Sequence, residues 1–232
     1  MRGLFVTGTD TGVGKTVVAC ALTRLLVERG VTVRPRKPIE SGCELRDGRP
    51  YPADAAALRA AAGNQEGLDT VCPHRLTAPI SPERATAREG KTIGLADLEQ
   101  ACRVGVGAKD FLLVEGAGGF LSPLAVDGRV CDLAERLKLP ILLVVADRLG
   151  CLNHAMLTTE AIAARGLTLV SVVLNRVDAD VISGMDNAAD LEKWLMRTIW
   201  RSSFGVVSQP WSSPGSELAA LTAHILKSTG YR

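Results

Sequence analysis

A glycine-rich segment near the N-terminus combines the residue types that hold phosphate groups. It reads Gly8-Thr9-Asp10-Thr11-Gly12-Val13-Gly14-Lys15-Thr16 and lies between an apolar run, Leu4–Val6, and a helical pattern. Glycines let backbone N–H groups turn toward phosphate oxygens, and the start of the following helix adds partial positive charge. Lys15 is expected to reach the β- and γ-phosphates of a nucleotide, and the Thr16 hydroxyl to bind Mg²⁺. A plain glycine-rich turn is the alternative, which the strand–loop–helix context disfavours.

Polar residues also follow the other apolar runs of the chain. In chain order these segments are Lys37-Pro38-Ile39-Glu40-Ser41-Gly42, Glu115-Gly116-Ala117-Gly118-Gly119, Asp147-Arg148 and Asn175-Arg176. Ligands bind outside the carboxyl ends of the strands in open parallel sheets, so these segments are candidates for a polyanion site. Lys37 and Ser41 are expected to follow a strand that neighbours the phosphate-loop strand. Glu115 ends an apolar run, where P-loop proteins place a metal-associated carboxylate, and the glycines after it favour that role over a solvated side chain.

Three further kinds of residue have two interpretations each. Asp54 stands in Ala53-Asp54-Ala55 at the start of a helical stretch, so spacing alone favours a helix cap over a metal ligand. Cys151, His154 and His74 invite a nucleophile interpretation, but no partner spacing supports one, and a buried thiol with ordinary imidazoles is favoured.

Alternating elements must position these residues. The apolar runs Leu4–Val6, Val31–Val33, Phe111–Val114, Ile141–Val145 and Leu169–Leu174 have strand length and suit parallel strands covered on both faces. Helices are predicted at 15–29, before Gly30, and at about 152–165, before Gly166. The pattern predicts an α/β fold with a doubly wound, mainly parallel sheet in three layers, as one domain over 1–232. Residues from about 39 to 92 break it as an irregular insertion with no clear strand, in which only 53–62 looks helical.

Composition excludes several classes of protein. The chain has 232 residues and a formal net charge of +2, which gives no reason to expect a nucleic acid or an anionic membrane as partner. The longest apolar stretch, 141–146, is too short to span a bilayer, and no secretory signal is visible. Six scattered cysteines without metal-ligand spacing are interpreted as free thiols of a reducing cytosol.

The motifs together resemble those of the dethiobiotin synthetase family, on a P-loop NTPase fold. The resemblance rests on the phosphate loop with its five-residue spacer between Gly8 and Gly14, on Lys37–Gly42, on Glu115–Gly119 and on Gly150-Cys151-Leu152-Asn153-His154-Ala155. It implies an ATP-dependent ligase of biotin biosynthesis. This enzyme carboxylates 7,8-diaminononanoate with CO₂ and closes the resulting carbamate to dethiobiotin through a carbamic-phosphoric anhydride, with ADP and phosphate as the other products.

The resemblance also implies a role for individual residues. Lys15 and Lys37 act on the transferring phosphoryl group and the carbamate. Thr16, Asp54 and Glu115 hold Mg²⁺, which replaces the cap interpretation of Asp54. The residues implied in ATP binding are Gly12, Val13, Gly14, Lys15, Thr16, Val17, Asp54, Glu115, Gly116, Ala117, Gly118, Asn175, Arg176 and Pro210. Those implied in substrate binding are Thr11, Lys37, Ser41, Gly150, Cys151, Leu152 and Asn153.

The resemblance further implies a homodimer with a shared substrate site. In it, the helix start at 150–153 binds the carboxylate of substrate held mainly by the partner subunit, whereas the alternative is that Asn153 only caps its own helix. The sequence departs from the family at Glu83, where a histidine is common, and after Phe204, where extra residues precede Pro210-Trp211.

Two other kinds of protein share the phosphate loop. Partitioning and cell-division ATPases carry an extra lysine near the start of the loop, a region that has Asp10 here. Amidating ligases of cobalamin synthesis usually bring a glutaminase domain, which 232 residues cannot accommodate. Both are therefore disfavoured.

Overall fold

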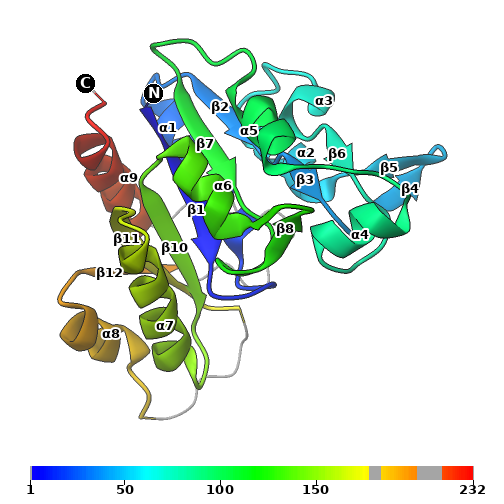
Figure 1. Cartoon of the computed structure of the whole chain (residues 1–232). Coiled ribbons are helices and arrows are strands. Elements are labelled where there is room, and N and C mark those ends of the chain that lie inside the picture. The colour runs from blue at the N-terminus through cyan, green and yellow to red at the C-terminus, as the bar shows by residue number, and fades with distance from the viewer. Residues whose placement is uncertain (1, 178–183, 203–215, 232) are drawn as a thin grey trace.

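A parallel sheet forms the centre of the protein (Figure 1). The computed structural model describes residues 2–177, 184–202 and 216–231. Within these ranges the sheet has six strands, in the spatial order β12 (Ile199–Ser202), β11 (Leu169–Asn175), β10 (Ile141–Ala146), β1 (Arg2–Gly8), β7 (Phe111–Glu115) and β2 (Val33–Arg36). Every neighbouring pair runs parallel. The predicted doubly wound α/β fold is confirmed.

The position of β2 differs from the prediction in two ways. Strand β7 lies between β1 and β2, so the strand before Lys37 is not a neighbour of the phosphate-loop strand. The strand also begins where the predicted run of 31–33 ends, and it contains the charged residues Arg34 and Arg36. Apolar runs locate buried segments but not pairing partners, and Arg36 is buried because Glu66 pairs with it, as described below.

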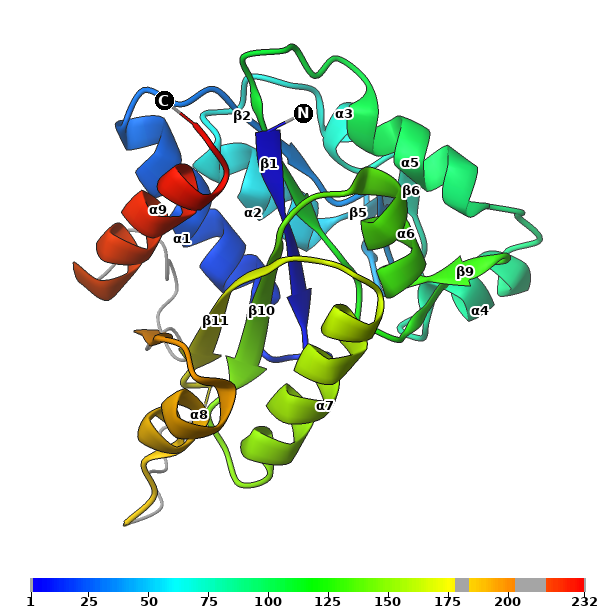
Figure 2. The ribbon, with the colours of Figure 1, turned by 60° about the vertical axis from the view of Figure 1, so that its left-hand side comes forward.

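Helices cover both faces of the sheet (Figure 2). One face carries α1 (Lys15–Glu28) and α9 (Ser216–Ser228), whose apolar side chains join one core cluster with β1 and β10. The other face carries α5 (Leu95–Arg103), α6 (Val130–Leu137) and α7 (Cys151–Ala164), with α8 (Asn187–Leu195) packed beside α7. These are the three predicted layers. Helix α1 ends as expected, because Gly30 has a φ of 78°, a left-handed value that favours glycine.

The insertion at 39–92 has more regular structure than the sequence indicates. It contains α2 (Ala53–Ala61), α3 (Leu68–Val71) and α4 (Pro82–Arg88). Strand β3 (Ile39–Glu40) pairs with β6 (His74–Arg75), and β4 (Glu44–Arg46) forms a hairpin with β5 (Arg49–Tyr51). A further pair, β8 (Pro123–Ala125) with β9 (Gly128–Arg129), follows β7. The expectation of a segment without strands was therefore wrong, because these strands are two or three residues long and have no alternating pattern.

Within the described ranges, no helix is both long and apolar enough to cross a membrane.

Candidate active site

The phosphate loop lies at the carboxyl end of β1, as predicted. Gly14 precedes α1 with a φ of 89°, which turns the backbone into the first helical turn. The Lys15 side chain is buried, and its Nζ donates to the carbonyl oxygen of Asp10 in the same loop at 2.8 Å. Burial lowers the pKa of Lys15 to about 8, although the Glu115 carboxylate opposes this shift. A buried ammonium that has one neutral carbonyl acceptor is well placed to receive a phosphate oxygen.

Lys37 joins the phosphate-loop region to two carboxylates. Its Nζ lies 2.6 Å from Asp54 Oδ2 and 2.6 Å from Glu115 Oε1. Burial acts to lower the pKa of Lys37, but the negative charges of Glu115 and Asp54 outweigh it and raise the pKa above its usual value. Lys37 is therefore a charged side chain held between two acids that come from other elements.

The same carboxylates lie beside Thr16. The Thr16 hydroxyl donates to Glu115 Oε1 at 2.8 Å, and Glu115 is buried. Among the described residues, no group hydrogen-bonds the other Glu115 oxygen, Oε2, which is buried too. A hydroxyl and two carboxylates with one unpartnered oxygen fit Mg²⁺, which proteins hold through one or two carboxylates together with phosphate oxygens and water. Across the described ranges, no set of three or more His, Cys, Asp or Glu side chains suits a metal ion, so phosphate oxygens would have to complete this site.

Asp54 does not cap its own helix, so the cap interpretation from spacing was wrong. The N-cap of α2 is Pro52, and Asp54 lies in the first turn with its carboxylate directed to Lys37. Burial acts to raise the pKa of Asp54, but the charge and hydrogen bond of Lys37 outweigh it and lower the pKa. The N–H groups of Asp54 and Ala55 instead donate to the carboxylate of Glu40, at 3.1 and 3.0 Å. Sequence reasoning missed Glu40 because its contacts lie 14 and 15 residues further along the chain.

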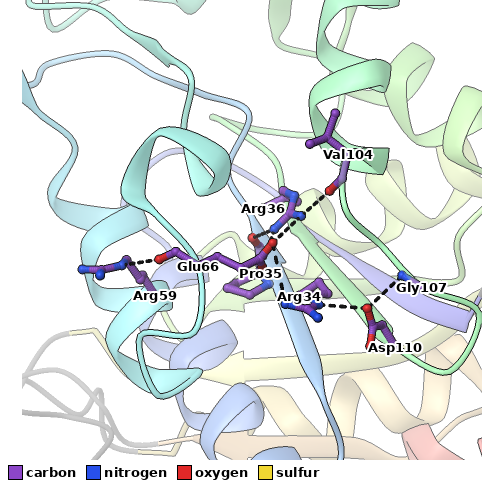
Figure 3. A network of polar contacts seen from close by, with 8 residues as sticks. All are labelled: Arg34, Pro35, Arg36, Arg59, Glu66, Val104, Gly107 and Asp110. Atoms are coloured by element: carbon purple, nitrogen blue, oxygen red, sulfur yellow. Dashed lines mark hydrogen bonds and ion pairs between the residues drawn. The ribbon is translucent and has the colours of Figure 1, made fainter.

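A buried arginine, Arg36, fixes the end of β2, directly before Lys37 (Figure 3). The guanidinium of Arg36 donates to both carboxylate oxygens of Glu66, at 2.8 and 2.9 Å, and to the carbonyl oxygen of Val104 at 2.6 Å. Arg59 of α2 donates to the Glu66 carbonyl oxygen at 2.6 Å. The segment after α2 and the end of α5 are thus tied to β2 directly before Lys37. Arg36 and Glu66 were not predicted, and an arginine inside a strand carries no sequence signal of burial.

The other predicted nucleotide residues gather around the loop. Asn175 is buried at the end of β11 and donates its amide to the Val13 carbonyl oxygen at 3.0 Å. The glycine segment after Glu115 packs on the phosphate loop, because Phe120 N–H donates to the Gly8 carbonyl oxygen at 3.1 Å. Arg176 is exposed. Pro210 lies outside the described residues. Gly12, Val17, Gly116, Ala117 and Gly118 all belong to these two loops or to the first turn of α1.

The predicted substrate residues fall in three places. Thr11 is exposed in the phosphate loop, and Ser41 follows β3. Gly150 is the N-cap of α7 with a φ of 87°, so Asn153 does not cap this helix. Cys151 is buried, Leu152 half-buried and Asn153 exposed. An exposed ion pair between Arg148 and Asp10, 3.3 Å long, connects the start of this helix to the phosphate loop.

The cysteines are free thiols, as expected, and Cys151 is buried, as expected. All six cysteines are free and buried, and burial raises the pKa of Cys151. His154 is exposed and His74 is half-buried on β6. This arrangement gives no support to a nucleophilic cysteine at Cys151.

The chain is similar to known ATP-dependent enzymes. Residues 2–201 match a family model described as an AAA domain. The ATP-dependent dethiobiotin synthetase BioD of Anaeromyxobacter dehalogenans is 46% identical over 85% of this chain and 87% of its own length. That of Aromatoleum aromaticum is 42% identical over 94% of this chain and 96% of its own length.

A solved structure shows the same fold at low identity. The ParA family ATPase from Chlorobium tepidum matches with a TM-score of 0.53 over 100% of this chain and 95% of its own, at 13% identity. This similarity supports the architecture of the sheet alone. The identity to the synthetases over most of both chains shows that the protein belongs to the family of ATP-dependent dethiobiotin synthetases.

Proposed function

We propose that the protein is a dethiobiotin synthetase, which uses ATP to carboxylate 7,8-diaminononanoate with CO₂ and to close the product to dethiobiotin. The observation that carries the proposal is the contact of Lys37 with both Asp54 and Glu115, at 2.6 Å each, beside a phosphate loop. A phosphate loop alone serves many reactions. A second buried lysine near the γ-phosphate suits an acceptor that is itself an anion, such as a carbamate.

In this proposal Lys15 and Lys37 bind different anionic groups. Lys15 binds the β- and γ-phosphates, while Lys37 leaves the carboxylates to hold the carbamate oxygens against the γ-phosphorus. One carbamate oxygen then forms a bond to phosphorus as the bond to the ADP oxygen breaks. Negative charge builds on oxygens in this step, so preorganised ammonium groups stabilise its transition state. Mg²⁺, held by Thr16, Asp54 and Glu115 with phosphate oxygens, would neutralise part of the same charge.

Ring closure needs no nucleophile from the protein. The second amine of the substrate attacks the carbonyl carbon of the mixed anhydride, phosphate leaves, and the amine proton is lost. Both reacting groups belong to one bound molecule, so holding them in position supplies most of the rate advantage. The buried thiols and the exposed His154 are consistent with this division.

The direct test is product formation by the purified protein. We expect dethiobiotin and an equal amount of ADP when 7,8-diaminononanoate, bicarbonate, Mg²⁺ and ATP are all present, measured by mass spectrometry and a coupled ADP assay. The Lys15→Gln variant is the control for a contaminating ATPase. ATP hydrolysis that neither diaminononanoate nor bicarbonate stimulates would contradict the proposal and favour a switch ATPase.

We further propose a homodimer with shared substrate sites, in which the start of α7 binds the substrate carboxylate from the partner subunit. Free N–H groups at a helix start favour an anion. Leu149 before this helix and Leu157 within it are 78% and 57% exposed, which suits burial against a second copy.

Subunit mixing tests this arrangement. Lys37→Gln and Leu152→Glu homodimers should both be inactive, while mixed dimers regain one intact site and part of the activity. Sedimentation should give a dimer. No recovery on mixing, or a fully active monomer, would rule the shared site out.

We also assign the protein to the cytoplasm, on the support of its six free thiols, since disulfides are rare in reducing compartments.

A further inference from the structure

Glu40 supplies the first turn of α2 with hydrogen-bond acceptors that this helix lacks. The N-cap residue is Pro52, and proline has no side-chain acceptor for the free N–H groups of the turn. Glu40 comes from another segment, and its two carboxylate oxygens each accept one N–H, from Asp54 and from Ala55. Glu40 is buried, with 7% of the residue exposed, so water does not substitute readily for these contacts.

Glu40 is itself fixed by its own backbone. It lies on β3, which pairs with β6 in register Glu40↔Arg75, and its carbonyl oxygen accepts the N–H of Leu76 at 2.9 Å. It follows Lys37 by three residues on the same segment. Residues 37–40 therefore position both partners of the Lys37–Asp54 ion pair. They include Lys37 itself, and Glu40 binds the backbone N–H of Asp54.

We propose that Glu40 is a positioning residue for Asp54, and that it sets the affinity of the site for a divalent cation bound with nucleotide. This inference rests on the proposed function. Both Glu40 oxygens are occupied by N–H groups, so Glu40 acts through the backbone of Asp54 and not as a ligand. Partners that orient metal ligands commonly change metal affinity by about 10- to 100-fold when they are lost.

The charge of Glu40 is the competing explanation. Glu40 is a third carboxylate near Lys37, and its charge alone would attract a cation whatever its hydrogen bonds. The two explanations differ for Glu40→Gln. An amide keeps one acceptor oxygen and loses the charge, so positioning predicts an intermediate effect, whereas charge predicts an effect equal to that of Glu40→Ala.

Binding of Mn²⁺, used as a paramagnetic probe for Mg²⁺, measures the effect without turnover. Electron paramagnetic resonance gives the Kd of Mn²⁺ for the full-length protein with saturating ADP. We expect Glu40→Ala to raise this Kd about tenfold or more and Glu40→Gln to raise it less. Calorimetry of metal-free ADP should give a Kd close to wild type in both variants.

A matched control destabilises α2 without touching Asp54. Arg59→Ala removes the contact to the Glu66 carbonyl oxygen near the other end of α2, so we expect a lower Tm with an unchanged Mn²⁺ Kd. Circular dichroism checks folding, and Glu40→Gln carries the test if Glu40→Ala fails to fold. A wild-type Mn²⁺ Kd in Glu40→Ala with a lower Tm would overturn the inference, and so would equal losses in the Ala and Gln variants. Wild-type protein that binds Mn²⁺ but makes no dethiobiotin would remove only the proposed function.

Discussion

The two lysines of the site experience opposite electrostatic environments. Lys15 donates to a neutral carbonyl oxygen, and burial lowers its pKa to about 8. Lys37 lies between two carboxylates, whose charges overcome the effect of burial and raise its pKa. Among the described residues, Lys15 therefore has no anionic partner within hydrogen-bond distance. The positive charge of Lys37, in contrast, is already balanced by the carboxylates of Asp54 and Glu115. This difference supports the proposal that Lys15 binds the nucleotide and that Lys37 acts on the second anion.

The different roles proposed for the two lysines predict the behaviour of Lys37→Gln. We expect an ATP affinity close to wild type by calorimetry, because Lys15 and the loop remain. Single-turnover phosphate release with diaminononanoate and bicarbonate should fall at least about 100-fold, because a charge clamp on the transferring group is lost. Lys91→Gln, at a half-exposed lysine paired with Glu89, is the matched control. Equal losses of affinity and rate would place Lys37 in the nucleotide site.

Gly14 and Gly12 offer a second test on single residues. Both have positive φ values, 89° and 76°, so alanine strains the backbone at either position. Only at Gly14 does an added Cβ also collide, 2.1 Å from Asn175 Nδ2, whereas at Gly12 it meets open space. We expect Gly14→Ala to lose ADP binding in calorimetry and Gly12→Ala to keep part of it. An equal loss in both variants would show that backbone strain alone decides the effect.

At the scale of elements, the order of the strands brings the site together. Because β7 lies between β1 and β2, Glu115 at its end contacts both Thr16, in the first turn of α1, and Lys37, directly after β2. The two arginines of β2 face the same side, and Glu66 pairs with both. These ion pairs of Glu66 with Arg34 and Arg36, called the clamp below, fix the edge strand β2 directly before Lys37.

The clamp predicts a large loss of stability in Glu66→Ala. Removing Glu66 leaves Arg36, which is fully buried, without its carboxylate, and breaking a buried pair costs about 3–5 kcal/mol. Urea denaturation measures the free energy of unfolding. Glu28→Ala breaks an exposed pair with Arg24 and should cost about 0.5 kcal/mol. A loss in Glu66→Ala as small as that of the control would mean that Arg36 finds other acceptors.

Much of this arrangement could be predicted from the sequence, and the remainder has physical reasons. Apolar runs locate strands, and glycines next to Lys15 locate the loop, because both signals are local. The position of β7 could not be found, since periodicity does not encode pairing partners. Asp54 was assigned to a helix start correctly, but spacing cannot show that its carboxylate meets Lys37. The hairpin of β4 and β5 could have been predicted from Asp47-Gly48, because Asp-Gly is typical of two-residue hairpin turns. Such turns need positive φ at both residues, and the values here are 51° and 73°.

At the scale of the whole molecule, burial protects all six thiols. Burial raises the pKa of Cys43 to about 11 and that of Cys102 to about 12. Only the thiolate reacts, so raised pKa values slow alkylation at any pH below them. The organisation of residues 1–232 as one domain stays a prediction, and a single cooperative unfolding transition would support it.

Thiol labelling tests this protection. Near pH 9 an ordinary cysteine is mostly ionised, while a thiol of pKa 11 is ionised to about one part in a hundred. We expect iodoacetamide at pH 9 to label the native protein slowly and all six cysteines rapidly in urea, counted by mass spectrometry. Rapid labelling of the native protein would show that a thiol is accessible and ionised in the folded state.

The pairing of β1 only with strands far along the chain has a consequence for its synthesis. Its neighbours are β7 and β10, and within the described ranges β2 pairs with β7 and not with β1. A ribosome-bound chain therefore carries β1 with two open edges until residue 115 has left the exit tunnel. Open apolar edges promote aggregation, so β1 is exposed to aggregation during this interval. The hydrogen bond between Thr16 and Glu115, which are 99 residues apart in the sequence, also forms only after this point.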